Sequence, residues 1–283
     1  MLQRVDRMQL AVRDREEAAR TFAAVLGARK DREDHLRTYN AARTVVQAGQ
    51  SEFELLEPAG DGPVAEHLER WGEGAFAGGF STGDLSALAA HLQSEGIRFA
   101  EEGGQLFIGP DQTRGMRTVI SADRTVDAPS LITHVYEVTN IVADHQEAAA
   151  FYARIFGLDA SRFCPIKSER FGYVGTLTLY NPPAQLDRIE ITQTTEPGLA
   201  MGRFYARRGE SIYMCFAETE AIRPIAEGLK ARGARYTADE DYVGSMFVHP
   251  TSLCGMLMGI SRTNEAWKWS GRPELAGAPG ATH

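Results

Sequence analysis

Apolar and polar residues follow a pattern that recurs along the chain with an offset of 130 residues, from Asp14 to Asp144. In each copy a short apolar stretch runs to the Asp, and an amphipathic segment then continues to a glycine, Gly27 or Gly157. An Asp before such a segment and a Gly after it are typical signals for the start and the end of a helix. The pattern therefore predicts a strand followed by a capped helix at both places.

A second pair of similar segments lies between the members of the first pair. Residues 85–99 align with residues 222–236, and each segment is typical of a helix of about three turns followed by the start of a strand. Both helices are expected to end at a glycine, Gly96 and Gly233. Further strands are predicted at residues 53–56, 104–109, 116–120, 189–192, 245–249 and 256–260.

The predicted order is strand, helix and several strands, four times over, which indicates an α+β fold of four βαβββ units. The units meet near residues 60, 125 and 196. Residues 123–130 are polar and contain a proline, so they are interpreted as a linker between two domains, 1–122 and 131–262. A tail at 263–283, rich in Gly, Pro and Ala near its end, follows. Trp267 and Trp269 are expected to cover apolar surface.

The composition narrows the class of protein. A length of 283 residues with 43% hydrophobic and 24% charged residues is typical of about two folded domains. The net charge of −8 argues against nucleic acid as a partner, and no apolar run reaches the ~20 residues of a membrane span. The N-terminus lacks the apolar core of a signal peptide, and the three cysteines form neither a disulfide pattern nor a CxxC motif. We expect a cytoplasmic protein, monomeric or homodimeric, whose partner is a small-molecule substrate.

Three local motifs carry a resemblance to a known family. An apolar strand leads into Asp-x-x-x-Ala-Ala-x-x-(Phe/Tyr) at residues 14–22 and 144–152, and Phe-Glu-Leu-Leu-Glu-Pro stands at 53–58. Phe-Val-His-Pro at 247–250 is followed by Gly-Met-Leu at 255–257. By these motifs the chain resembles the vicinal oxygen chelate superfamily of glyoxalases, bleomycin resistance proteins and extradiol dioxygenases. The resemblance implies two tandem domains, each a curved, mixed, eight-stranded sheet with outer helices that forms a cup around a ligand.

The resemblance also implies positions for metal ligands in each unit. One lies seven residues before the helix-capping Asp, and the other is a Glu near the start of the last strand. In the first unit these positions hold Arg7 and Glu54, and in the second they hold Ala77 and Val119. Since one of four ligands remains, the N-terminal cup is interpreted as a structural domain with a degenerate site. In an alternative interpretation, Arg7 and Gln9 share a strand face and bind an anionic or carbonyl ligand.

The C-terminal cup keeps two of the four positions, Glu137 and Glu190, while Met214 and Gly259 occupy the others. Neither Met nor Gly is a ligand for a hard cation. The set departs from the two His and one Glu of the extradiol dioxygenases, so ring cleavage is not favoured. Glu137 and Glu190 are predicted to be catalytic and to be the metal ligands if a metal is bound. The cofactor is left open between a weakly held Mg²⁺ or Mn²⁺ and none.

His134 is a third catalytic candidate. It lies three residues before Glu137, which in a regular strand places it on the opposite face. A bulge at Tyr136 would turn it inward. Among the neighbouring residues, Tyr213 is expected to face away from the cup, and Cys254 is interpreted as a buried, inert thiol.

The third unit and the segment after it are enriched in Arg and Tyr. The residues are Arg170, Tyr173, Tyr180, Arg188, Tyr205, Arg207 and Arg208. They are either solvated arginines and sheet aromatics or a rim that holds an acidic or aromatic substrate. On the second interpretation Arg170, Tyr173, Tyr205 and Arg207 bind the substrate.

Two functions of different class fit these residues. In the first, the C-terminal cup is the site of an isomerase, lyase or hydrolase that acts on a small carbonyl-bearing or phenolic compound through an oxyanion or enolate. In the second, the chain is a metal-free protein that sequesters a hydrophobic small molecule. A divergent extradiol-type dioxygenase is a further alternative. Retention of both carboxylates in the third unit favours the enzyme.

Overall fold

The computed structural model describes residues 1–220, 222–238 and 244–277. They form two eight-stranded sheets with the same strand order, β2-β3-β4-β1-β5-β8-β7-β6 and β10-β11-β12-β9-β13-β16-β15-β14. In each sheet the two central strands are antiparallel, and each of them pairs in parallel with the last strand of its own unit. The predicted α+β fold of four βαβββ units is confirmed, whereas the domain limits at 122, 131 and 262 stay a prediction. The end of the predicted tail, 278–283, lies outside the described residues.

The elements follow the predicted order. The first sheet contains β1 (Leu2–Ala11), β2 (Arg29–Leu36), β3 (Ala41–Ala48), β4 (Ser51–Pro58), β5 (Gly74–Thr82), β6 (Ala100–Glu102), β7 (Gln105–Ile108) and β8 (Thr118–Ala122). The second contains β9 (His134–Ile141), β10 (Cys164–Ser168), β11 (Tyr173–Leu177), β12 (Arg188–Thr194), β13 (Ser211–Thr219), β14 (Tyr236–Ala238), β15 (Ser245–Val248) and β16 (Leu257–Arg262). The α-helices are α1 (Arg15–Leu26), α2 (Pro63–Trp71), α3 (Leu85–Ser94), α4 (His145–Phe156), α5 (Ala200–Arg208) and α6 (Ile222–Ala231), and the chain ends in the 3-10 helices η6 (Glu265–Trp269) and η7 (Pro273–Gly277).

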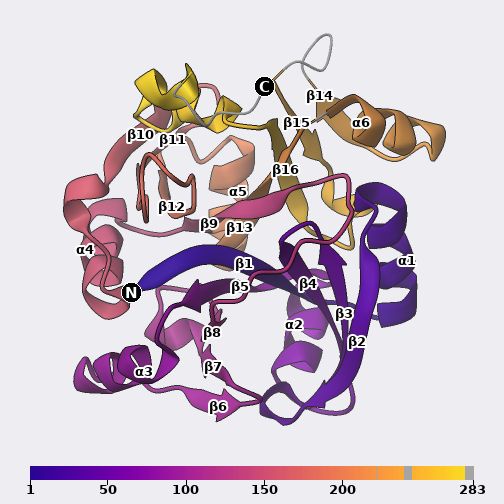
Figure 1. The fold of residues 1–283 in the computed structure, drawn as a ribbon, viewed down its shortest axis with the longest axis horizontal. Helices are drawn as coiled ribbons and strands as arrows, with labels where there is room; N and C mark the ends of the chain where they lie inside the picture. Colours follow the sequence, from indigo (N-terminus) through magenta and orange to yellow (C-terminus); the bar gives the residue numbers. More distant parts are fainter. Residues whose placement is uncertain (221, 239–243, 278–283) are drawn as a thin grey trace.

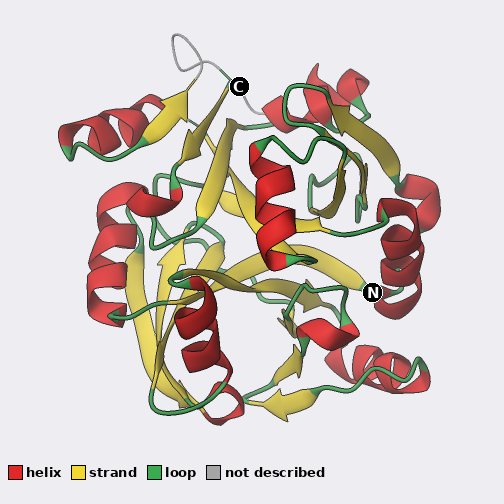
Figure 2. Cartoon of the chain, turned by 180° about the vertical axis from the view of Figure 1, so that it is seen from behind, coloured by secondary structure: helices red, strands yellow, loops and turns green. Residues whose placement is uncertain are grey.

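Helices α1, α3, α4 and α6 lie on the outer faces of the two sheets (Figures 1 and 2). One apolar core joins these helices to both sheets, and Phe22, Phe80 and Phe156 are fully buried in it. The sheets approach closely at Gly78 on β5, where a Cβ atom would lie 3.2 Å from the side chain of Val138 on β9. The opposite, concave face of each sheet forms a cup. We call them the N-terminal cup (β1–β8) and the C-terminal cup (β9–β16).

The capping signals found in the sequence act as expected. The Asp14 carboxylate accepts the N–H groups of Glu16 and Glu17 at 2.9 and 2.8 Å. The Asp144 carboxylate accepts the corresponding N–H groups of its own helix at 2.9 and 3.0 Å. Helices α1 and α4 then end at glycines with φ of 69° and 60°, a left-handed conformation in which a Cβ atom would be strained.

The Asp144→Ala substitution should lower the free energy of unfolding by about 1 kcal/mol, because two N–H groups of α4 lose their acceptor. Asp144→Asn is the matched control, since its side-chain carbonyl can still accept these hydrogen bonds. Urea unfolding measures both variants. An equal loss in the Ala and Asn variants would show that the cap does not act through its hydrogen bonds.

The central strands carry β-bulges that change which side chains face the cups. On β9, Val135 and Glu137 pair with neighbouring residues of β13, so Tyr136 is an extra residue and a bulge is present at this position. Asp6 occupies the same place on β1. A further bulge at Tyr213 on β13 lets this ring pack against the apolar residues of the C-terminal cup. The prediction that Tyr213 faces away was wrong, because a bulge breaks the alternation of a regular strand.

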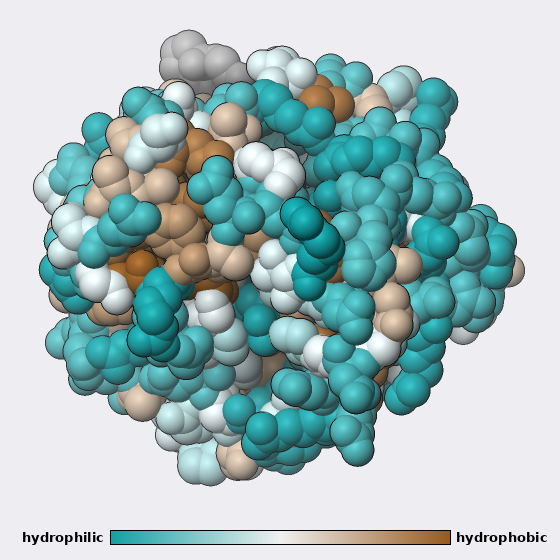
Figure 3. Space-filling view, turned by 90° about the horizontal axis from the view of Figure 1, so that it is seen from below, coloured by the Kyte–Doolittle hydropathy of each residue, from teal (hydrophilic) through white to brown (hydrophobic). Residues whose placement is uncertain are grey.

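The surface of the molecule in Figure 3 is mostly hydrophilic, as expected from the composition. Hydrophilic side chains cover most of the face in Figure 3, and hydrophobic ones gather toward one side of it. Within the described part of the chain, none of the helices has the length and apolar character needed to cross a membrane.

The three cysteines are free, and burial raises the pKa of the Cys254 thiol to about 12. This thiol is therefore not a ready nucleophile at neutral pH.

Candidate functional site

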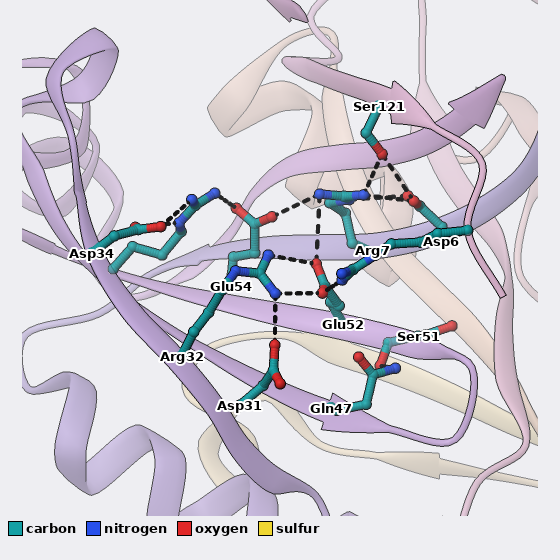
Figure 4. Close-up of polar contacts among 12 residues, drawn as sticks. Asp6, Arg7, Asp31, Arg32, Asp34, Gln47, Ser51, Glu52, Glu54 and Ser121 are labelled. Atoms are coloured by element: carbon teal, nitrogen blue, oxygen red, sulfur yellow. Dashed lines mark hydrogen bonds and ion pairs between the residues drawn. The ribbon is translucent and has the colours of Figure 1, made fainter. Parts of the chain in front are cut away.

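The guanidinium of Arg7 lies within a network of polar side chains of the N-terminal sheet (Figure 4). It donates hydrogen bonds to Asp6 at 3.0 and 2.6 Å and to Glu54 at 3.0 Å. Glu52 lies 3.5 Å away, and the hydroxyl of Ser121 accepts a further bond. All three nitrogens of this buried side chain are thus engaged by the protein itself.

Glu54 closes the network from the opposite side. Its carboxylate accepts hydrogen bonds from Arg43 at 2.9 Å and Gln9 at 2.8 Å, in addition to Arg7. Burial alone would raise the pKa of Glu54, but the charges of Arg7 and Arg43 outweigh burial and lower it to about 2. Arg7 and Gln9 therefore bind a protein carboxylate, in contrast to the alternative in which they bind a ligand.

Apolar side chains fill the remainder of the N-terminal cup. Ala77 and Val119, which stand at the other two ligand positions, are completely buried there. Helix α2 adds Val64 and Leu68 to the same cluster. A cup whose charges are paired internally and whose remaining space is apolar supports the interpretation of a structural unit.

The C-terminal cup has a different centre. Glu137 on β9 and Arg188 on β12 are both fully buried, and Arg188 Nε donates to the Glu137 carboxylate at 2.7 Å. The hydroxyl of Thr139 donates to the same carboxylate at 3.0 Å. Glu190 lies on β12 two residues beyond Arg188, on the same face of the sheet, and Tyr173 on β11 donates a hydrogen bond to it. We call Glu137, Arg188, Glu190 and Tyr173 the acid–arginine cluster.

The two cups carry the same ion pair with its charges exchanged. In the N-terminal sheet Arg7 on β1 is paired in register with Glu52 on β4. In the C-terminal sheet Glu137 on β9 is paired in register with Arg188 on β12. The exchange moves the guanidinium to the other strand, where different neighbours surround it.

Those neighbours leave Arg188 incompletely bonded. Within the described residues, Nη1 and Nη2 of Arg188 are buried and have no hydrogen-bond partner. Asp6, which binds the guanidinium in the N-terminal cup, is replaced at the equivalent bulge by Tyr136, whose ring centre lies 5.1 Å from Arg188 Cζ. Buried donors without acceptors are rare in native proteins, so this pair of NH₂ groups is directed at a ligand or at ordered water.

Glu190 and Glu137 share a hydrogen bond. Burial, and then the nearby charge of Glu137, raise the pKa of Glu190 well above its ordinary value. Burial and the neighbouring charge therefore favour the protonated form of Glu190, while Glu137 is the carboxylate that pairs with Arg188. The cluster thus places a protonated carboxyl beside a carboxylate, the combination required for general acid–base chemistry.

Aromatic and apolar side chains surround the acid–arginine cluster. They include Tyr136, Leu177, Leu179, Leu186, Met214, Phe216, Phe247, Trp267 and Trp269. The absence of a side chain at Gly259 makes room for the ring of Phe216, which a Cβ atom would approach to 2.2 Å. Trp267 is 2% exposed, and the ring centres of Trp269 and Phe216 lie 6.4 Å apart. Helix η6 therefore closes this cup. The two tryptophans therefore pack into the cup, not merely over outer apolar surface.

The acid–arginine cluster does not suit a divalent cation. Met214 and Gly259 offer no ligand, and the carboxylate of Glu137 is already bound by a guanidinium that would repel a metal ion. The described residues contain no group of three or more His, Cys, Asp or Glu side chains that could hold a metal. Arg188 was interpreted from the sequence as solvated or part of a rim, and its burial corrects that interpretation.

The other predicted site residues are separated from one another. His134 lies in a cavity of about 220 Å³ that neither Glu137 nor Glu190 lines. Arg170 is exposed, and its guanidinium carbon lies 5.3 Å from the ring centre of Phe171. Tyr205 is half-buried and Arg207 exposed, both on α5. The structure therefore brings Tyr173 alone of the four predicted substrate-binding residues to the cluster, and the roles of the others stay predictions.

The comparisons with known proteins agree on the fold. Residues 6–110 match the family model described as Glyoxalase/Bleomycin resistance protein/Dioxygenase superfamily. A triple mutant of 4-hydroxymandelate synthase from Streptomyces coelicolor is similar with a TM-score of 0.69 and 14% identity, covering 97% of this chain and 99% of that one. A fusion of a xylose isomerase-like TIM barrel with 4-hydroxyphenylpyruvate dioxygenase gives 0.59 and 12% identity, covering 98% and 53%. No curated protein matches the chain.

These similarities and the two cups define a tandem fold of four βαβββ units. Residues 6–110 match a family model of the superfamily that the motifs predicted, and the whole chain has the fold of its solved members. At such low identities the solved structures establish the fold alone, so the reaction has to be argued from the site.

Proposed function

We propose that the C-terminal cup catalyses proton transfer next to the carbonyl or phenolic group of a small molecule, in an isomerisation or elimination that passes through an oxyanion. The observation that carries this proposal is the guanidinium of Arg188, whose two NH₂ groups lack partners among the described residues, beside the hydrogen-bonded pair of Glu137 and Glu190. A polarised oxygen needs donors of this kind, and a migrating proton needs one base and one acid.

The chemistry follows from the positions of these groups. The substrate oxygen accepts hydrogen bonds from Nη1 and Nη2 of Arg188, and the carboxylate of Glu137 takes the proton from the adjacent carbon. The negative charge moves to the substrate oxygen, where Arg188 stabilises it. Glu190 then delivers its proton to the second carbon or to the leaving group. A proton passing from Glu137 to Glu190 through their shared hydrogen bond restores the starting state.

The apolar wall strengthens these interactions. Tyr136, Phe216 and Trp267 are buried around the cluster and keep water from the charges. Electrostatic interactions are stronger where water is excluded, so a developing oxyanion gains more from Arg188 there than at the surface. The substrate should therefore carry an apolar or aromatic body next to its carbonyl or phenolic oxygen.

A second candidate function is the sequestration of a hydrophobic compound without reaction. The observation that favours it is the closed cup itself, since η6 buries Trp267 directly against the apolar wall. Such a protein would bind the same class of compound through Arg188 and the aromatic rings. It would not move a proton.

Deuterium exchange distinguishes the two functions even when the reaction product has not been identified. A panel of aryl and alkyl carbonyl compounds is incubated with the protein in D₂O, and proton NMR follows exchange at the carbon next to the carbonyl. The wild type should catalyse exchange of at least one class of compound. The Glu190→Gln and Glu137→Gln variants should each lose about 100-fold or more in rate, because each removes a proton carrier.

Glu220→Gln is the control, because Glu220 is exposed and stands just after β13 outside the cup. It should exchange at the wild-type rate. Compounds that raise the melting temperature of the wild type without any catalysed exchange would support sequestration and contradict the enzyme.

A further inference from the structure

The cavity that His134 lines lies where the N-terminal sheet meets the edge of the C-terminal cup. It has a volume of about 220 Å³, and we call it the junction pocket. Its lining residues are Arg4, Gln50, His134, Ala184, Gln185, Leu186, Asp187, Glu218, Asn264 and Trp267. They come from both sheets, from the loop between β11 and β12, and from the segment that leads into η6.

Two buried carboxyl groups line the junction pocket without a paired cation. Asp187 is 2% exposed, and its Oδ1 accepts the backbone N–H of Val5 at 2.7 Å. Glu218 is 5% exposed, and its Oε1 accepts the backbone N–H of Asn264 at 2.8 Å. Neither carboxyl forms an ion pair within the described ranges 1–220, 222–238 and 244–277.

Arg4 also lines the pocket, but among the described residues it forms no ion pair with either carboxyl. Its Nε donates to Asp123 at 2.9 Å, and its Nη2 donates to the backbone carbonyl of Arg124 at 2.6 Å. Its remaining nitrogen donates to Gln50 at 3.5 Å. The guanidinium therefore donates its hydrogen bonds to other groups and to neither of the two carboxyls.

The pKa values agree with a shortage of positive charge. Burial raises the pKa of Asp187 to about 7 and outweighs the lowering effects of the Val5 N–H and the charge of Arg4. Burial raises the pKa of Glu218 as well. A cation placed between them would allow both groups to ionise.

His134 supplies an independent sign of a ligand. The residue lines the junction pocket, and its Nδ1 is buried and has no hydrogen-bond partner among the described residues. Burial and the nearby charge of Arg4 lower the pKa of His134 to about 4, so the ring is neutral at pH 7 and one of its nitrogens accepts a hydrogen bond. A buried ring nitrogen left without a partner is destabilising, so a polar partner fits beside this ring.

We propose that the junction pocket binds the ammonium group of a small organic amine between Asp187 and Glu218, in the cavity that His134 also lines. An ammonium group brings a positive charge and three N–H donors, and the two buried carboxyl groups provide acceptors for them. Trp267 and Leu186 give its carbon skeleton an apolar surface, and the indole ring attracts cations. A metal ion fits less well, since no grouping of metal-ligating side chains occurs among the described residues.

Calorimetry with three ligands of similar shape tests the amine site. Benzylamine should bind at least about tenfold more tightly than benzyl alcohol or benzoate, because the alcohol lacks the charge and the acid has the wrong one. Its affinity should rise between pH 5.5 and pH 8, since Asp187 ionises near pH 7 while the amine stays protonated and His134 stays neutral. Burial also raises the pKa of Glu218, so its ionisation changes the affinity in the same direction.

Variants locate the site. Asp187→Asn with Glu218→Gln should reduce benzylamine affinity by about tenfold or more, and Glu220→Gln should leave it unchanged. Nuclear Overhauser contacts between bound benzylamine and the Trp267 indole provide a second readout on the wild-type chain, which holds even if the double variant does not fold. Equal affinity for the alcohol, no binding of benzylamine, or binding without contacts to Trp267 would overturn the proposal.

Discussion

The Glu54→Gln variant should lose about 3 kcal/mol of its free energy of unfolding at pH 7, while Glu190→Gln should change it by less than about 1 kcal/mol. Both residues are buried glutamates at equivalent places on the last strand of a unit. Glu54 is ionised and holds Arg7 and Arg43, so its removal leaves buried cations short of a partner. Burial and the charge of Glu137 favour the protonated form of Glu190, so we expect an amide of the same shape to replace it at little cost.

The pH dependence gives the sign of the Glu54 effect. The pKa of Glu54 is lowered to about 2 in the folded chain, so its stabilising contribution is present above its unfolded pKa of 4.5 and is lost as the pH falls toward 2. The gap between wild type and Glu54→Gln should therefore narrow below pH 4.5. Urea unfolding followed by circular dichroism at pH 7 and pH 3 measures this gap. A loss in Glu190→Gln as large as that in Glu54→Gln would mean that Glu190 is an ionised structural residue.

Arg188→Lys should reduce catalysed exchange by about 10²–10³-fold while the chain stays folded. Lysine keeps the positive charge next to Glu137. It lacks the planar guanidinium, whose two NH₂ groups are proposed to donate hydrogen bonds to the substrate oxygen. Arg98→Lys is the control, because Arg98 is exposed in the N-terminal half. Retention of full activity in Arg188→Lys would remove Arg188 from the proposed mechanism.

A stability cycle separates this catalytic role from a structural one. Arg188→Met alone should cost about 3–5 kcal/mol, since it leaves the Glu137 carboxylate buried without its cation. Adding Glu137→Met should recover most of that loss, because well-packed apolar residues often replace a buried ion pair without cost. The double variant should remain inactive. Recovery of exchange together with stability would show that the pair serves the fold alone.

Local signals in the sequence were sufficient for the elements and their order. Asp14 and Asp144 cap their helices, and glycines end these helices, because such contacts form between residues only a few positions apart. The repeat then predicted four similar units, and the family motifs predicted how the units combine. Strand alternation also places Glu190 two residues from Arg188 on one face, so Arg-Ile-Glu-Ile by itself indicates that these two side chains lie together.

The tertiary structure decided the chemistry of the two cups. Glu137 and Arg188 are 51 residues apart in sequence, and the parallel pairing of β9 with β12 brings them together. Bulges that the alternation of residues does not reveal turned Tyr136 and Tyr213 toward the C-terminal cup. Local patterns in the sequence were enough to determine the fold. Whether a buried charge has hydrogen-bond partners depends instead on all its neighbours in space. Only the packed sheets therefore decided that Arg7 is fully paired and that Arg188 keeps two NH₂ groups for a ligand.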